Sequence, residues 1–278
     1  LVATSGDTGK AALEGFADVD GTGICVFYPY GGTSEIQRLQ MTTQQGKNVL
    51  VTAVKGNFDD AQSGVKAIFT DKAYTDELKE MGIRLSSANS INWGRLVPQV
   101  AYYFSAYCDM ANAGAVKFGD EINIAVPTGN FGNILAAYIA KLCGLPVKRF
   151  ICASNKNNVL TDFIQSGTYD KNRPFYLTTS PSMDILISSN LERLLFFMAN
   201  RGSEAADAAL VASLMAQLKE TGRYTLPNDM LERIRAQFLC GRADNDAAFA
   251  AIRDMWQNSR YLMDTHTAVA YSVYAQLK

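Results

Sequence analysis

Short hydrophobic runs alternate along this chain with longer amphipathic stretches. The short runs are rich in β-branched and aliphatic residues, which is typical of strands that are buried on both faces of a sheet. They cover residues 23–27, 49–54, 84–86, 122–126 and 149–153. The stretches between them place hydrophobic residues at helical spacing. This alternation predicts an α/β fold in which helices cover parallel sheets.

The first three residues read as the end of one more buried strand. Leu1, Val2 and Ala3 run directly into a glycine turn. Because a strand normally has about five or six residues, we expect further residues before Leu1 in the natural protein.

The pattern changes after about residue 185, where helical spacing continues without a strand signal. The predicted helices cover residues 190–200, 204–220, 228–240 and 246–261. Turn residues separate them, and Asp246 is the expected N-cap of the last helix. Before residue 185, helix C-terminal caps are expected at Gly46, Gly82 and Gly144.

Charge and cysteine content narrow the choice of partners. The 278 residues carry 26 Lys and Arg against 27 Asp and Glu, so there is no net field to hold nucleic acid or an anionic membrane. The least charged stretch, residues 122–140, contains turn residues that lipid would penalise, and no membrane span is expected there. The five cysteines form no CxxC pair, which fits reduced thiols in the cytoplasm.

Residues 4–9, Thr-Ser-Gly-Asp-Thr-Gly, lie between the first strand and a predicted helix. Small side chains let an anion approach the backbone. The N–H groups at the helix start, with the hydroxyls of Thr4, Ser5 and Thr8, are suited to a carboxylate or a phosphate. The alternative is that Asp7 or Thr8 simply caps the helix.

Residues 126–134, Val-Pro-Thr-Gly-Asn-Phe-Gly-Asn-Ile, form a second passage from a strand into a helix. Gly129 and Gly132 permit a nest of converging amides, which suits a phosphate monoester. The spacing is neither the GxGxxG of a dinucleotide site nor the Gly-Lys-Ser/Thr of a nucleoside triphosphate site. A purely structural connection is the alternative, because Gly and Asn are also ordinary turn residues.

Residues 89–95, Asn-Ser-Ile-Asn-Trp-Gly-Arg, follow a predicted strand and precede a helix around residues 98–107. Asn92 and Arg95 can then reach one cleft, and the forked guanidinium of arginine suits a phosphate. An arginine beside an aromatic residue is also a common packing or surface residue, so this alternative stays open.

Other catalytic schemes find few residues to use. His266 is the only histidine, so a zinc site of several histidines cannot form and a Ser-His-Asp triad must use this residue. Its position beside Asp264 is more typical of a structural histidine. Asp59 and Asp60 are adjacent at a predicted helix start, which favours helix capping over paired acid and base catalysis.

Three loops suited to anions fit a phosphorylated cofactor that meets a phosphorylated substrate, and the segments concerned resemble those of threonine synthases. The resemblance rests on segments that stand in the order of that family and cover nearly the whole chain. They are residues 4–9, 56–62, 89–95, 129–133 and 264–268. They favour the longer subgroup of the family, found in bacteria and fungi. Thr265 departs from the pattern, because proline is expected there.

The resemblance implies pyridoxal 5'-phosphate as the cofactor and fold type II, the architecture of the tryptophan synthase β-like enzymes. A smaller α/β domain is then expected at residues 1–90. A larger cofactor-binding α/β domain is expected at residues 91–278, with a helical insertion at about 190–261. The implied activity is a lyase reaction of threonine biosynthesis, in which O-phospho-L-homoserine and water give L-threonine and phosphate.

The resemblance also assigns roles to single residues. The residues implied to hold the cofactor phosphate are Gly129, Asn130, Phe131, Gly132 and Asn133. Those implied to bind the substrate are Thr4, Ser5 and Thr8 at its carboxylate, and Asn92 and Arg95 at its phosphate. Asp7 lies where related enzymes have an asparagine near the phenolic oxygen of the cofactor.

The lysine that anchors the cofactor in this family is expected upstream of Leu1, in a Phe-Lys-Asp context that the chain does not contain. Lys55 is the best internal candidate, but its neighbours match a different family segment and we expect it to be exposed. The family segment that supplies a hydroxyl to the pyridine nitrogen is expected beyond Lys278. We therefore expect no catalytic residue in this chain and no activity from it alone.

Two other functions stay open at this point. A serine or threonine dehydratase of the same fold would not need a second phosphate site at Asn92 and Arg95. A non-catalytic Rossmann-like nucleotide-binding module is the alternative from another class, although neither spacing typical of such sites is present. The oligomeric state is also open, because the edge of an open sheet invites pairing with another chain.

Overall fold

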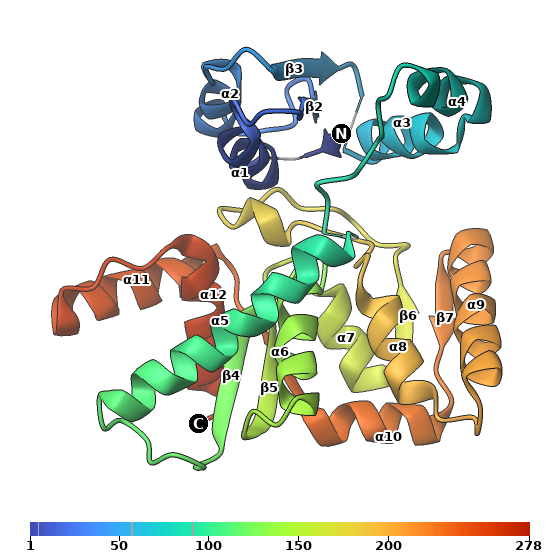
Figure 1. Cartoon of the computed structure of the whole chain (residues 1–278). Coiled ribbons are helices and arrows are strands. Elements are labelled where there is room, and N and C mark those ends of the chain that lie inside the picture. Colours follow the sequence, from blue (N-terminus) through green and yellow to red (C-terminus); the bar gives the residue numbers. More distant parts are fainter. Residues whose placement is uncertain (5, 57, 91) are drawn as a thin grey trace. The chain divides into compact units, whose positions relative to one another are not determined.

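The computed structural model describes residues 1–4, 6–56, 58–90 and 92–278. The chain forms two compact units, Leu1–Arg95 and Leu96–Lys278. Both units contain parallel strands separated by helices, so the predicted α/β class is confirmed (Figure 1). The assignment of separate functions to residues 1–90 and 91–278 stays a prediction.

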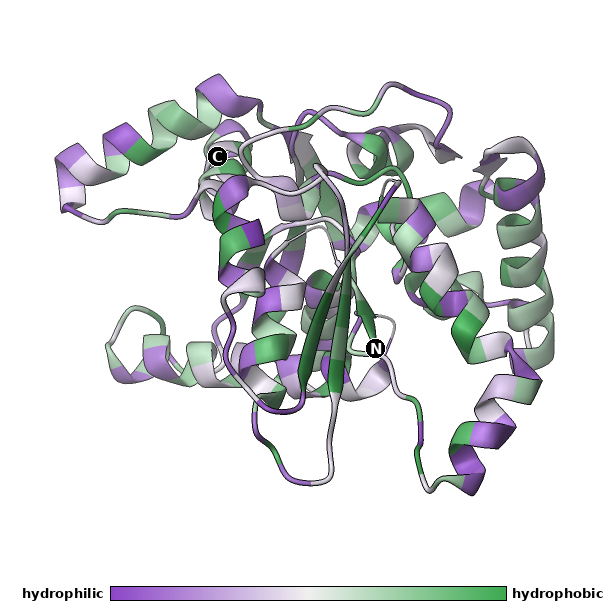
Figure 2. Ribbon diagram, turned by 90° about the horizontal axis from the view of Figure 1, so that it is seen from above, coloured by the Kyte–Doolittle hydropathy of each residue, from purple (hydrophilic) through white to green (hydrophobic). Residues whose placement is uncertain are grey.

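The first unit is built on a parallel sheet with the strand order β1-β2-β3. Its strands are β1 (Val2–Ala3), β2 (Ile24–Pro29) and β3 (Val49–Val54), and its helices are α1 (Asp7–Phe16), α2 (Glu35–Thr42), α3 (Phe58–Thr70) and α4 (Lys72–Glu80). Leu13 of α1 and Met41 of α2 are fully buried in one cluster with Val2 and Val26 of the sheet. The strands appear among the most hydrophobic parts of the ribbon (Figure 2).

The segment after α4 does not form the strand predicted at residues 84–86, but its continuation runs along β1. The amino group of Leu1 donates to the carbonyl of Ser86 at 2.7 Å, and the N–H of Ala88 donates to the carbonyl of Leu1 at 3.1 Å. The strand prediction is wrong because the pairing with this segment begins only at the last predicted residue, Ser86, and continues to Ala88.

Asn89 continues this pairing with its side chain. Its Oδ1 accepts a hydrogen bond from the N–H of Ala3 at 3.2 Å, and its Nδ2 donates to the carbonyl of Ala3 at 2.7 Å. The side-chain amide therefore takes the place of a peptide group on a neighbouring strand. This contact fixes the start of the loop at residues 89–95.

Two of the three expected glycine caps are confirmed. Gly82 follows α4 and Gly144 follows α6 (Gly132–Leu142), with φ of 77° and 102°. In both cases the next N–H bonds back into the helix, as in a Schellman motif. The expectation for Gly46 is wrong, because α2 already ends at Thr42 and Thr43 is its C-cap.

The second unit is built on a parallel sheet with the order β4-β5-β8. Its strands are β4 (Ile122–Pro127), β5 (Val147–Ser154) and β8 (Phe238–Arg242), and a small antiparallel pair consists of β6 (Thr168–Asp170) and β7 (Arg223–Thr225). Its helices are α5 (Trp93–Asn112), α6, α7 (Val159–Ser166), α8 (Leu191–Ala199), α9 (Glu204–Thr221), α10 (Asn228–Gln237), α11 (Asn245–Ser259) and α12 (Thr265–Gln276), with a 3-10 turn at Pro181–Met183.

The expectation of an uninterrupted helical segment at residues 190–261 is wrong in two places. β7 and β8 interrupt it, and the helix predicted at residues 228–240 ends at Gln237, where β8 begins. β8 pairs in parallel with β5, with Phe238 opposite Phe150. A short apolar run fits the end of a buried helix or a buried strand equally well, and here the neighbouring strand decides between them.

The N-cap of α11 also differs from the expectation. Asp244 accepts a hydrogen bond from the N–H of Ala247 at 3.0 Å, so Asp244 and not Asp246 caps the helix. The chain leaves β8 at Arg242, which lets the helix begin earlier than the sequence pattern suggests.

Aromatic side chains form the centre of the second unit. Phe238 of β8 lies 5.1 Å from Phe150 of β5 and 5.9 Å from Phe131, measured between ring centroids, and Tyr138 of α6 lies 6.1 Å from it. Phe131 belongs to the loop before α6, so the core and this loop are directly connected.

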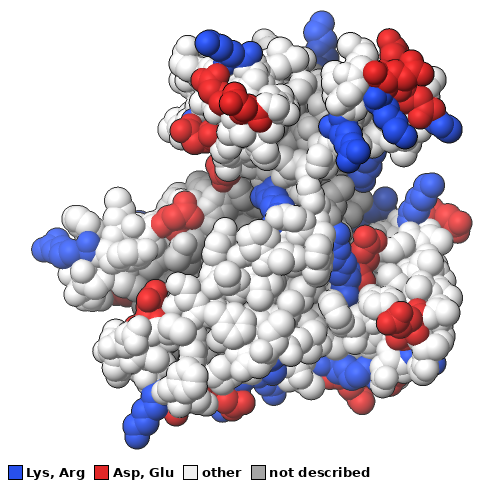
Figure 3. Space-filling view, in the orientation of Figure 1, with Lys and Arg blue, Asp and Glu red and all other residues white. Residues whose placement is uncertain are grey.

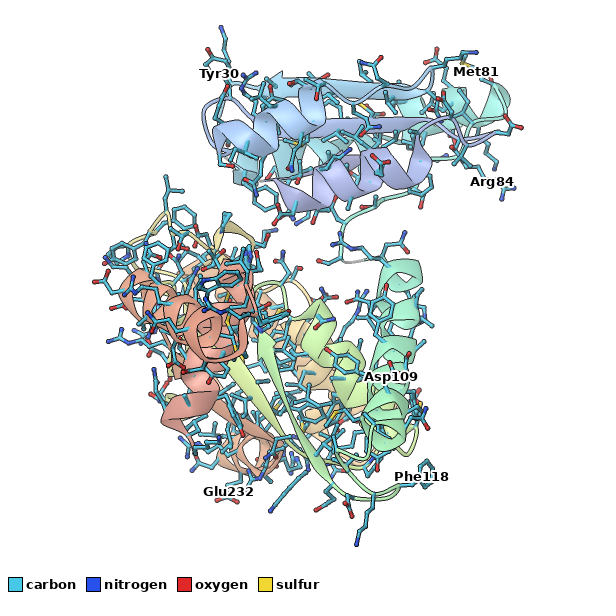
Figure 4. All side chains as sticks on the ribbon, turned by 90° about the vertical axis from the view of Figure 1, so that its left-hand side faces the viewer. Tyr30, Met81, Arg84, Asp109, Phe118 and Glu232 are labelled. Atoms are coloured by element: carbon cyan, nitrogen blue, oxygen red, sulfur yellow. The ribbon has the colours of Figure 1, made fainter. Side chains whose placement is uncertain are left out.

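The surface of the second unit over α5 carries few charged side chains (Figure 3). Val97 and Tyr102 are exposed there, and Asp109 and Phe118 project from the unit (Figure 4). Among the described residues, no helix combines the length and hydrophobicity that a membrane span requires.

Replacing Asn89 with alanine is expected to destabilise the first unit by about 1–3 kcal/mol, because both polar backbone groups of Ala3 lose their partner. Urea unfolding followed by the fluorescence of Trp93, in a Trp256→Phe background, measures this change. Gln45→Ala is the control, because it removes a side-chain hydrogen bond to the backbone in an exposed loop of the same unit. Equal unfolding midpoints for the two variants would contradict the strand-like role of Asn89.

Candidate functional site

The loop at residues 129–133 lies at the carboxyl end of β4 and leads into α6. Phe131 is the N-cap of α6 and has left-handed backbone angles, φ 64° and ψ 1°. Its side chain is only 2% exposed and packs on Phe238. Burial of this ring offsets a backbone conformation that is unfavourable for a residue with a Cβ. A left-handed residue followed by the helical Gly132 brings successive N–H groups toward one point.

Hydrogen bonds from behind hold two carbonyl groups of this loop. Ser188 Oγ donates to the carbonyl of Gly129 at 2.8 Å. Asn190 donates to the carbonyl of Asn130 twice, from its backbone N–H at 3.0 Å and from Nδ2 at 2.9 Å. In a planar trans peptide the carbonyl and the following N–H point in opposite directions. The N–H groups of Asn130 and Phe131 therefore point away from Ser188 and Asn190.

The amide N–H groups of this loop are not used within the described structure. In the part of the chain that the structure describes, no group accepts a hydrogen bond from the backbone N–H of residues 129–134. They precede or begin the first turn of α6, where the helix dipole adds partial positive charge. The loop is therefore suited to an anion with several oxygen atoms.

Gly129 is needed because another segment approaches it closely. A Cβ at this position would lie 2.5 Å from the carbonyl oxygen of Ser182 and 3.3 Å from Cα of Met183. Both atoms belong to the backbone, so a larger residue would displace either the loop or the turn at Pro181–Met183. The turn therefore packs directly against the loop at Gly129.

A polar network holds the residue that follows this turn. Asp184 Oδ1 accepts hydrogen bonds from Asn155 Nδ2 at 2.7 Å and from Asn157 Nδ2 at 3.0 Å, and Oδ2 accepts from the N–H of Thr178 at 2.9 Å. Burial raises the pKa of Asp184, and these hydrogen bonds oppose the shift without cancelling it. Asn155 and Asn157 follow β5 directly, and polar residues at the end of a buried strand are the signal that would have identified them.

Asn133 is held by α5. Tyr103 Oη donates to Asn133 Oδ1 at 2.6 Å, and Asn133 Nδ2 donates to Gln99 Oε1 at 3.0 Å. Burial raises the pKa of Tyr103, so the phenol stays protonated and remains a donor. These contacts engage the Asn133 side chain, and a contact between its backbone N–H and an anion stays a prediction.

The loop in the first unit is organised by Thr4. The buried Thr4 Oγ1 accepts hydrogen bonds from the N–H groups of Gly6 and Gly9, both at 2.9 Å, and donates to the carbonyl of Gly6 at 3.1 Å. Thr4 is thus part of the framework of the loop, and direct contact with a substrate stays a prediction. Ser5 lies outside the described residues.

Asp7 does not cap α1, and neither does Thr8. The N-cap is Gly6, which makes no side-chain capping bond, so the helix-capping alternative for this loop is wrong. Asp7 Oδ1 instead accepts a hydrogen bond from Gln37 Nε2 at 2.8 Å. Gln37 also forms the capping box of α2 with Ser34, which fixes its side chain. Sequence reasoning did not identify Gln37, because a capping-box glutamine gives no sign of a second contact.

Thr8 and Arg95 come together in the first unit, although they are far apart in the sequence. Arg95 Nη2 donates to Thr8 Oγ1 at 3.3 Å, and Nη1 donates to the carbonyl of Ala88 at 2.9 Å. Burial lowers the pKa of Arg95. A guanidinium ion that has lost part of its water favours the approach of an anion.

Asn92 is turned toward its own loop. Its Nδ2 donates to the carbonyl of Ser87 at 2.6 Å, and its Oδ1 accepts from the N–H of Gly94 at 2.9 Å. One N–H of Nδ2 is thus used within the loop, and the contact of Asn92 with a substrate phosphate stays a prediction. Lys55 is exposed, as expected.

No protein-family model matches the chain. Threonine synthase-like 1 of Macaca fascicularis is 45% identical over 277 residues, which are 97% of this chain and 37% of the relative. Threonine synthase of Pseudomonas aeruginosa is 41% identical over 270 residues, which are 96% of this chain and 54% of the relative.

A solved structure agrees over the whole chain. It is a pyridoxal phosphate-bound threonine synthase from Brucella melitensis, with 42% identity and a TM-score of 0.86, and the match covers 100% of this chain and 56% of that one. The expected fold type II architecture is thereby confirmed. The chain, which spans about half or less of the length of these relatives, belongs to the threonine synthase family.

Proposed function

We propose that this chain supplies the binding loops of a threonine synthase, the lyase of threonine biosynthesis that converts O-phospho-L-homoserine and water into L-threonine and phosphate. The row of backbone N–H groups at residues 129–134, directed away from Ser188 and Asn190, is the observation that carries this proposal. It is supported by 41% identity to a bacterial threonine synthase. A cytoplasmic location, where cysteines stay reduced, fits the proposed biosynthetic role.

The residues present fit pyridoxal 5'-phosphate. The proposed ligands of its phosphate are Gly129, Asn130, Phe131, Gly132 and Asn133, acting through their backbone N–H groups. The loop contains no basic side chain, so recognition depends on oriented dipoles, which suits a small phosphate held away from water. When bound, the cofactor supplies an electron sink for reactions at the α- and β-carbons of an amino acid.

The loops of the first unit are proposed to bind the substrate. Thr8, with Thr4 and Ser5, is assigned to its carboxylate, and Arg95, with Asn92, to its phosphate. The contact between Arg95 and Thr8 supports this assignment, because it places a cation and a hydroxyl next to each other. Asp7 is proposed to lie near the phenolic oxygen of the cofactor, held in place by Gln37.

The purified chain is expected to bind pyridoxal 5'-phosphate and inorganic phosphate reversibly, and to bind pyridoxal more weakly than either of them. Isothermal titration with the three compounds measures this, with NAD and ATP as tests of the nucleotide-binding alternative. The phosphate group is expected to supply most of the binding free energy, because the loop recognises its ligand through backbone N–H donors. Binding of pyridoxal as tight as that of its phosphate ester would exclude the proposed site.

Gly129→Ala is expected to weaken phosphate affinity about tenfold or more, since relieving backbone overlap of this kind costs on the order of 1–3 kcal/mol. The added methyl group would push against the carbonyl of Ser182. Gly15→Ala is the matched control, because a Cβ there meets no atom within 4 Å. Titration with inorganic phosphate should distinguish the two variants, and unchanged affinity in Gly129→Ala would show that the loop does not hold the anion.

Asn190→Asp is expected to reduce affinity for phosphate and stability together, the latter by about 1–3 kcal/mol. A carboxylate oxygen would replace Nδ2, which lies 2.9 Å from the carbonyl of Asn130. The carbonyl would then be repelled and the N–H of Phe131 would turn.

Asn228→Asp, at the exposed start of α10, is the control of equal charge. Thermal unfolding and phosphate titration are measured on both variants. The anchoring role of Asn190 is refuted if its variant behaves like the one at position 228.

A further inference from the structure

His266 has a defined place in the second unit, although the candidate site does not include it. Its Nε2 lies 3.1 Å from the N–H of Ser182, and its Nδ1 lies 2.9 Å from Asp264 Oδ1. The side chain is 18% exposed. Hydrogen bonds at both ring nitrogens therefore fix the orientation of the imidazole.

These partners determine which ring nitrogen carries the proton in the neutral imidazole. A backbone N–H can only donate, so Nε2 must be the acceptor and the proton of the neutral imidazole must be on Nδ1. Nδ1 then donates to the Asp264 carboxylate. Burial raises the pKa of Asp264, but its interactions with His266 and with the N–H of Thr267 together lower it by more, so the carboxylate stays ionised and maintains this tautomer.

The turn that His266 contacts packs directly against the loop at residues 129–133. Ser182 is the middle residue of the Pro181–Met183 turn, and its carbonyl occupies the space next to Cα of Gly129. Met183 is buried in a cluster with Ala268 and Val269 of α12. The turn is therefore held by α12 on one side and by the Asp184 network on the other.

We propose that His266 is a positioning residue for the loop at residues 129–133: by accepting a hydrogen bond from the N–H of Ser182 it fixes the turn at Pro181–Met183, and the turn fixes Gly129. The inference rests on the proposed function of residues 129–133 as a phosphate site. It assigns no contact with the ligand to His266. The physical requirement is an acceptor at the position of Nε2, not an imidazole ring.

Three variants of the chain test this requirement. His266→Ala removes the acceptor, and His266→Gln restores one, because glutamine Oε1 reaches about as far from the backbone as Nε2. Gln276→Ala is the matched control, because it also removes a hydrogen bond between an α12 side chain and the backbone, the one that Gln276 Nε2 donates to the carbonyl of Arg242 at 3.3 Å. Affinity for inorganic phosphate is measured by calorimetry, and amide NMR shifts and hydrogen exchange are measured for Ser182 and residues 129–133.

His266→Ala is expected to weaken phosphate binding about five- to tenfold, the value of one hydrogen bond. The amides of Gly129 and Ser182 should shift, and exchange at Ser182 should become faster. His266→Gln should recover most of the affinity and of the Ser182 protection, while Gln276→Ala should resemble the unmodified chain.

An equal loss of phosphate affinity in His266→Ala and His266→Gln would overturn the inference. A loss of affinity that a replacement acceptor does not rescue reflects the packing of the ring. Unchanged amide shifts at Gly129 in His266→Ala would overturn it too. If the unmodified chain does not bind phosphate at all, the proposed function fails instead, and the amide shifts still decide whether His266 positions the turn.

Discussion

The candidate anion site depends on the hydrogen bonds that hold the carbonyl groups of Gly129 and Asn130. A peptide group is rigid, so Ser188 and Asn190 orient the N–H groups on the opposite side of the backbone without touching any ligand. A loop without basic side chains then becomes attractive to an anion. Without these two anchors, the glycines at 129 and 132 would make the loop adaptable but would not direct its amides.

The same loop is part of the hydrophobic core. Phe131 combines a left-handed backbone with a buried ring, and its partner Phe238 belongs to a strand from much later in the chain. The geometry of the amides is therefore maintained by the packing of the second unit. This arrangement keeps the loop rigid, because moving it would expose an aromatic ring to water.

In the first unit, side-chain hydrogen bonds maintain the geometry of the loops. Thr4 accepts hydrogen bonds from the amides of its own loop, and Gln37 donates one to Asp7. The side-chain amide of Asn89 pairs with the backbone of Ala3 as a neighbouring strand would. Among the described residues of these loops, Thr8 and Arg95 bring a hydroxyl and a guanidinium together. The proposed recognition of anions therefore rests on backbone dipoles in the second unit and on a cation and a hydroxyl in the first.

The sequence by itself determined the α/β class, the strands at 49–54 and 122–126, and the two glycine loops, because hydrophobic periodicity and turn residues act over a few neighbouring positions. It also identified the family, through short segments that keep their order. Only the tertiary structure decided that Phe238 lies in a strand, that Ser188 and Asn190 anchor a loop about 60 residues before them, and that His266 contacts the turn at Ser182. Each of these depends on a partner far away in the chain, and local pattern carries no information about which distant donor or strand will be adjacent after folding.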